Sequence, residues 1–130
     1  MNYLLISLHL PLIIYNERML AERLTAEENR ALMELKDVLN RLLGDRLQVF
    51  VLYGSKARGD WDSKSDIDVA IVVKGLTGRL KRQILDKVAE VEFKHLIPIS
   101  TLVLSERDFN SLKERERRIA LDIEKEGIPL

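Results

Sequence analysis

Two aspartates near the middle of the chain have a spacing that suits metal binding. Asp66 and Asp68 begin an apolar run that continues to Val73. Residues two apart in a β-strand project from the same face, so the two carboxylates are expected to point together. Neighbouring carboxylates repel each other and are costly to remove from water, and a bound cation relieves both effects. Because Mg²⁺ prefers hard oxygen ligands, the pair predicts a magnesium site.

A Gly-Ser turn upstream of the aspartates has the features of a phosphate site. Gly54 and Ser55 follow an apolar run at residues 47–53, which is typical of a buried strand. Glycine lets a backbone N–H approach an anion closely, and a helix that begins here would direct its N-terminus at negative charge. Lys56 and Arg58 supply cations. The turn and the aspartates together are expected to hold a metal-bound polyphosphate.

The arrangement of these residues resembles the signature of a known superfamily. Gly54-Ser55, ten intervening residues and Asp66-x-Asp68 are similar to the motif of the DNA polymerase beta nucleotidyltransferase superfamily. The segments GSKARGD and SDIDVAIV resemble its small stand-alone members, the minimal nucleotidyltransferases of the MntA-like antitoxin type that is paired with HEPN toxins. The alternative is a turn with two solvated aspartates, which the spacing, the flanking strands and the basic residues disfavour.

The resemblance implies an enzyme that transfers a nucleoside monophosphate, with ATP as the expected donor, to an acceptor hydroxyl. Asp66 and Asp68 would be both the catalytic residues and the ligands of one or two Mg²⁺ ions, which neutralise charge on the phosphates. The residues implied for nucleotide binding are Gly54, Ser55, Lys56 and Arg58.

The acceptor is expected to be a protein, because a domain this small has little surface left to bind a large acceptor. Small members of the family are often encoded beside a HEPN-type ribonuclease toxin, and some neutralise it by adenylylating a tyrosine. The resemblance therefore implies an antitoxin with a HEPN-type partner, in a homo- or hetero-oligomer. The alternative is a non-catalytic antitoxin or adaptor that binds only nucleotide or partner. Transfer to a small molecule, as in aminoglycoside nucleotidyltransferases, is less favoured because those enzymes usually add a second domain.

The third expected strand departs from the superfamily pattern, in which it usually carries a third carboxylate. The segment IPISTLVL contains no acid, and Ser100 and Thr101 occupy its middle. A neutral hydroxyl cannot replace a carboxylate as a base at pH 7. Acids that flank the strand and could reach the site are Glu90, Glu92, Glu106 and Asp108. Two acids could suffice for transfer, with positioning and Mg²⁺ responsible for most of the catalysis. The alternative is a protein that only binds nucleotide or a partner.

Composition predicts one globular domain in a reducing compartment. The 130 residues include 21 basic and 21 acidic side chains, so the net charge is zero and no direct binding to nucleic acid is expected. The chain has no cysteine, which excludes disulfides and thiol chemistry and fits the cytoplasm.

Residues 1–18 are expected to be an extension of a single nucleotidyltransferase domain at residues 19–130. The apolar run at residues 1–15 is too short for a membrane-spanning helix and lacks the flanks of a signal peptide, so no membrane association is expected. An edge strand, a partner-binding arm and sequence translated upstream of the natural start are the three interpretations. The last is favoured, because Met19 opens the part that resembles the family.

The elements around the motif predict an α/β (α+β) fold with a mixed sheet of three to four strands flanked by helices. The two motif strands must be antiparallel, because only then does the start of the second lie beside the end of the first. A capping box at Thr25 and Glu28 predicts a helix that ends at Gly44. The elements expected further on are a helix at residues 79–95, a strand at residues 97–104 and one long helix between Ser105 and Gly127.

Overall fold

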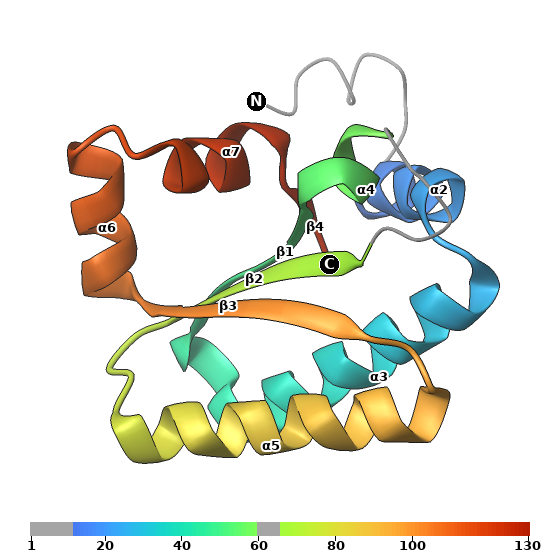
Figure 1. The fold of residues 1–130 in the computed structure, drawn as a ribbon, viewed down its shortest axis with the longest axis horizontal. Coiled ribbons are helices and arrows are strands. Elements are labelled where there is room, and N and C mark those ends of the chain that lie inside the picture. The colour runs from blue at the N-terminus through green and yellow to red at the C-terminus, as the bar shows by residue number, and fades with distance from the viewer. Residues whose placement is uncertain (1–11, 60–65) are drawn as a thin grey trace.

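The computed structural model describes residues 12–59 and 66–130 and has a mixed sheet at its centre (Figure 1). The strand order is β3-β2-β1-β4. β1 and β2 are antiparallel neighbours, as the motif requires, while β3 runs parallel to β2 and β4 antiparallel to β1. The strands are β1 Leu47–Tyr53, β2 Ile67–Val73, β3 Ile99–Ser105 and β4 Ile128–Pro129. The predicted fold class and the antiparallel pairing are confirmed.

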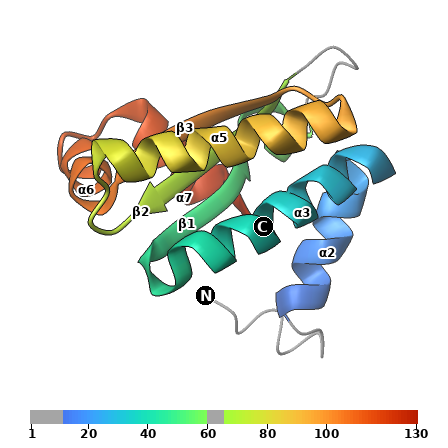
Figure 2. The same cartoon turned by 90° about the horizontal axis from the view of Figure 1, so that it is seen from below.

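Helices cover both faces of the sheet. α3 and α5 lie side by side on one face, and α6 and α7 lie on the other (Figures 1 and 2). The helices are α2 Leu12–Arg23, α3 Ala26–Leu43, α4 Gly54–Arg58, α5 Gly78–His95, α6 Glu106–Glu114 and α7 Arg118–Glu126, with a short 3-10 helix, η1 Gly44–Arg46, after α3. Within the described ranges, no helix has both the length and the apolar character needed to cross a membrane.

The alternation of side chains along β2 decides which face carries the predicted site. Ile67, Val69, Ile71 and Val73 belong to the larger core cluster, which contains the buried leucines of α3 and the buried residues of α5. Ala70 and Val72 belong to a second cluster with residues of α6 and α7. Because Asp68 has the same parity as Ala70 and Val72, its side chain lies on the face that α6 and α7 cover.

The capping box at the start of α3 is present as predicted. The Thr25 hydroxyl accepts a hydrogen bond from the Glu28 N–H at 3.1 Å, and Glu28 Oε1 accepts one from the Thr25 N–H at 2.8 Å. Gly44 ends the helix, also as predicted. These contacts satisfy backbone groups that the helix ends leave unpaired.

The prediction of one long C-terminal helix is wrong, because the chain breaks between α6 and α7. Glu116 has a φ of 52°, a left-handed conformation that ends α6, and the Arg117 N–H bonds back to the Leu112 carbonyl at 2.9 Å. Glu116 is four residues beyond Leu112, where a continuous apolar stripe would need an apolar side chain. After α7, Ile128 and Pro129 pair with β1 as β4.

The predicted boundary between residues 18 and 19 falls inside α2. Residues 1–11 lie outside the described part of the chain, but α2 begins at Leu12 and continues to Arg23. Leu20 and Leu24 are 4% and 7% exposed and belong to the larger core cluster. The sequence analysis missed this helix, and its second half is part of the folded core.

Leu20→Ala is therefore expected to lower the free energy of unfolding by about 2–5 kcal/mol, the cost of truncating a buried leucine. Urea denaturation followed by circular dichroism measures the change. Glu22→Ala, at an exposed position of the same helix, should stay within about 0.5 kcal/mol of the wild type. Equal effects of the two substitutions would show that α2 does not contribute to the core.

Candidate functional site

The two halves of the motif meet where β1 ends and β2 begins. Tyr53, the last residue of β1, pairs with Asp68, and Gly54 follows with a φ of 76°. A Cβ atom on Gly54 would lie 2.5 Å from Asp68 Oδ2, closer than two such atoms can approach. Gly54 is thus required both by the left-handed backbone and by the carboxylate that occupies the space of a side chain.

The two aspartates interact through their charges. Asp66 is exposed and directly precedes β2, while Asp68 is half-buried. Burial raises the pKa of Asp68 above the ordinary aspartate value, and the charge of Asp66 raises it further. The charge of Arg58 and a hydrogen bond with Ser100 oppose this increase in pKa without cancelling it. The two ionised carboxylates therefore repel each other, and a bound cation would reduce that repulsion.

Tyr53 and Ser100 flank Asp68 on the two neighbouring strands, and the sequence analysis did not assign either to the site. The register of the parallel strands β2 and β3 places Ser100 beside Asp68. On the other side, burial raises the pKa of Tyr53, and so does the charge of Asp68. Only the strand register identifies these neighbours, because the two residues lie far from Asp68 in the sequence.

The four acids that flank β3 in the sequence do not lie beside Asp68. Glu92 Oε2 accepts a hydrogen bond from the Ile99 N–H at 2.9 Å, and Glu90 lies 3.5 Å from Lys87 on α5, the helix on the opposite face from Asp68. Glu106 and Asp108 are in the first turn of α6, which follows the end of β3, whereas Ser100 is near its start. Their positions give no third carboxylate beside Asp68.

Lys56 is buried and paired with a carboxylate in this structure, and its role in nucleotide binding stays a prediction. Its side chain is 5% exposed, and its Nζ lies 3.2 Å from Glu28 Oε2. Glu28 therefore completes the capping box of α3 with one oxygen and pairs with α4 through the other. A buried charge needs such a pairing, so Lys56 joins α4 to α3.

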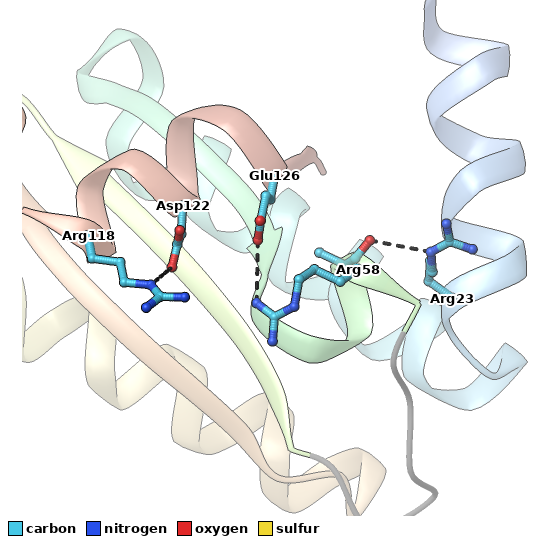
Figure 3. Close-up of polar contacts among 6 residues, drawn as sticks. Arg23, Arg58, Arg118, Asp122 and Glu126 are labelled. Atoms are coloured by element: carbon cyan, nitrogen blue, oxygen red, sulfur yellow. Dashed lines mark hydrogen bonds and ion pairs between the residues drawn. The ribbon is translucent and has the colours of Figure 1, made fainter.

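Arg58 projects from α4 toward α7 (Figure 3). Its charge favours the ionised form of Asp68 and opposes the increase in the pKa of that carboxyl. Its Nη1 lies 3.4 Å from Glu126 Oε2, with both side chains about two-fifths exposed. A pair this exposed contributes little to stability. Arg58 is therefore a cation of α4 whose charge influences Asp68. Its role in nucleotide binding stays a prediction, and its pairing with Glu126 was not predicted.

The two aspartates offer the hard oxygen donors that Mg²⁺ prefers. Among residues 12–59 and 66–130, no group of three or more His, Cys, Asp or Glu side chains could hold a metal ion. Mg²⁺ is commonly bound through one or two carboxylates, with substrate phosphates and water at the other positions. Asp66 and Asp68 fit that pattern, because a cation between them would offset the repulsion that raises the pKa of Asp68.

Comparison with known proteins gives matches over most of the chain. Residues 32–127 match a family model described as "Nucleotidyltransferase domain". A protein of Methanocaldococcus jannaschii named "Putative protein adenylyltransferase MJ0141" is 38% identical over 71 residues, which are 54% of this chain and 72% of that protein. "Putative protein adenylyltransferase MJ0604" of the same organism is 32% identical over 84 residues, 64% of this chain and 79% of that protein. A crystal structure described as a putative nucleotidyltransferase from Sulfolobus solfataricus aligns with a TM-score of 0.42 and 25% identity, and covers 80% of this chain and 78% of that one.

Proposed function

The chain belongs to the nucleotidyltransferase domain family, and from this premise we propose that it transfers AMP from ATP to a hydroxyl of a partner protein. The single observation that carries the proposal is the contact between the two halves of the motif. The Asp68 carboxylate occupies the space beside Gly54 that a side chain would fill. A nucleotide whose phosphates are bound at the Gly-Ser turn would therefore lie next to the aspartates.

Each group of the site has a role in this reaction. Gly54 and Ser55 would seat the terminal phosphates, with Arg58 as the nearby cation. Asp66 and Asp68 would hold Mg²⁺, which when bound supplies positive charge to the phosphates and alignment of the reacting groups. The acceptor oxygen would form a bond to the α-phosphorus as the bond to the departing pyrophosphate breaks.

A tyrosine is the acceptor that this site suits best. No carboxylate lies on β3 beside Asp68, so this strand offers no base for an aliphatic hydroxyl. The phenol of tyrosine has an unperturbed pKa of about 10 and loses its proton far more readily than serine does. Both archaeal relatives carry the name "Putative protein adenylyltransferase", which supports a protein acceptor. The resemblance noted from the motif extends the proposal to an antitoxin that modifies a HEPN-type toxin.

A second candidate is a non-catalytic antitoxin that binds nucleotide or partner without transfer. The observation that favours it is Ser100, which lies beside Asp68 on β3. In the superfamily that the motif resembles, this strand usually carries a third carboxylate. The two candidates make opposite predictions for the covalent state of the partner.

The test is to incubate the chain with Mg²⁺, labelled ATP and the protein encoded by the neighbouring gene. We expect the partner to gain the mass of one or more AMP groups, and peptide mapping to place them on tyrosine. An unchanged mass together with full neutralisation of the partner would support the binding candidate instead. AMP found only on serine or threonine would contradict the argument for tyrosine.

A further inference from the structure

The short helix α4 carries the Gly-Ser turn, and with five residues it is too short to be stable alone. Its position must come from contacts with other elements. Lys56 is paired with Glu28 of α3, and Arg58 with Glu126 of α7. Both contacts act through long side chains of α4, so neither fixes its backbone directly.

Arg23, at the end of α2, contacts the backbone of α4 directly (Figure 3). Its Nε donates a hydrogen bond to the Ala57 carbonyl at 3.4 Å. The carbonyl groups in the last turn of a helix lack partners within the helix, and a cation there is favourable. Arg23 therefore supplies both a donor and a positive charge at the end of α4.

The guanidinium also lies against the residue that ends α4. Gly59 has a φ of 80°, and a Cβ atom on it would lie 3.2 Å from Arg23 Cζ and 3.3 Å from Arg23 Nε. Arg23 thus fills the space that a side chain on Gly59 would take. The hydrogen bond and this contact together hold the end of α4 against α2.

α2 holds Arg23 in a fixed position because the helix packs into the larger core cluster through Leu20. Leu20 of α2 and Leu24, the residue after the helix, are both buried, and the Arg23 side chain is itself only 28% exposed. A group held on a packed helix positions a site more accurately than one on a loop. Arg23 also precedes residues 32–127, the part that matches the nucleotidyltransferase family model.

We infer that Arg23 is a positioning residue that holds α4, and with it Gly54 and Ser55, in the place where a nucleotide is bound. The inference rests on the proposed function for the role of the turn. The fit at the other end of α4 is tight, since the space beside Gly54 is occupied by Asp68. A small shift of α4 would therefore separate the phosphate turn from the aspartates, and misplacement by about 1 Å can reduce a reaction about 100-fold.

The test compares Arg23→Met with Arg30→Met in the full chain. Arg30 is exposed on α3 and pairs with Glu27, so its substitution removes the same groups without touching α4. Amide hydrogen exchange of residues 54–59 is measured without nucleotide, and the affinity for ATP with Mg²⁺ is measured by calorimetry. We expect Arg23→Met to exchange faster in residues 54–59 but not in β2, and to bind ATP about 10- to 100-fold more weakly. Arg30→Met should match the wild type in both measurements.

Each other outcome decides against part of the inference. Unchanged exchange at residues 54–59 in Arg23→Met would show that Arg23 does not hold α4. Faster exchange with unchanged ATP affinity would show that the contact is structural only and does not position the nucleotide site. A wild-type chain that binds no ATP would overturn the proposed function and the nucleotide role of Arg23 with it, whereas the exchange data would still report whether Arg23 holds α4.

Discussion

Asp68→Asn is expected to reduce nucleotidyl transfer by at least about 100- to 1,000-fold, the scale of losing one preorganised electrostatic group from an active site. The amide keeps the size of the side chain but cannot provide the negative charge that the proposed Mg²⁺ site needs. Transfer of labelled AMP to the partner protein measures the effect. Asp86→Asn, an exposed position on α5, removes a carboxylate from the opposite side of the sheet and should retain full activity.

Asp68→Asn should also stabilise the protein at neutral pH in the absence of divalent metal. Burial and the charge of Asp66 raise the pKa of Asp68 in the folded state. A raised pKa means that the folded state disfavours the ionised form. The contribution of Asp68 to stability is therefore complete below its unfolded pKa of about 3.9 and is lost as the pH rises through the raised folded pKa. Asparagine does not titrate. The free energy of unfolding of Asp68→Asn should therefore exceed that of the wild type by more as the pH rises through this window.

Chemical denaturation in a chelator, repeated from pH 3.5 to pH 7, would measure this difference at ~0.5-unit intervals across the window. We expect the free-energy advantage of Asp68→Asn to be largest at pH 7 and smallest near the acidic limit. Added Mg²⁺ should stabilise the wild type more than the mutant. A mutant that loses stability at pH 7 under chelation would contradict the electrostatic account, and a mutant that keeps its transferase activity would contradict the assignment of Asp68.

The parts of the fold that could be predicted depend on residues close together in the sequence. The capping box of Thr25 and Glu28 is a local pattern, and the antiparallel pairing of β1 and β2 follows from the need to bring Gly54 and Asp68 together across a short connection. Both predictions are confirmed. The break between α6 and α7 was also encoded locally, because Glu116 interrupts the apolar stripe, but the apolar residues on either side concealed it.

The partners of charged side chains could not be predicted, because they join elements that are distant in the sequence. Lys56 and Arg58 are two residues apart and are equivalent as cations in a motif. The structure pairs Lys56 with Glu28 inside the protein and leaves Arg58 near the aspartates with Glu126. The contact between Arg23 and α4 is of the same kind, since it depends on how α2 packs. Only the three-dimensional packing distinguishes a cation buried in an ion pair from one that is partly exposed.

Gly54→Ala is expected to reduce transfer at least about 100-fold, the effect of misplacing reacting groups by about 1 Å. The new methyl group would lie 2.5 Å from Asp68 Oδ2, so either the carboxylate or α4 must move. The substitution also places a side chain at a φ of 76°, which costs about 1–2 kcal/mol in any protein. Activity and the free energy of unfolding should therefore both fall.

Gly75→Ala is the control that separates these two effects. Gly75 also has a positive φ, of 68°, but a Cβ atom there would meet nothing within 4 Å. Its substitution should carry the conformational cost alone and leave transfer unchanged. A loss of stability in Gly54→Ala no greater than in Gly75→Ala, together with normal activity, would show that the contact with Asp68 is not restrictive.

A double-mutant cycle with Asp68→Ala then tests the contact itself, because removing the carboxylate removes the obstacle to the new methyl group. In the Asp68→Ala background, Gly54→Ala should lower the free energy of unfolding by only about the 1–2 kcal/mol expected for the left-handed backbone. In the wild-type background it should cost more, and the difference is the energy of coupling between the two positions. A coupling energy near zero would mean that Gly54 is required for its backbone conformation only. A clear coupling would establish that the Gly-Ser turn and the aspartates are built as one unit, which is the premise of the proposed nucleotide site.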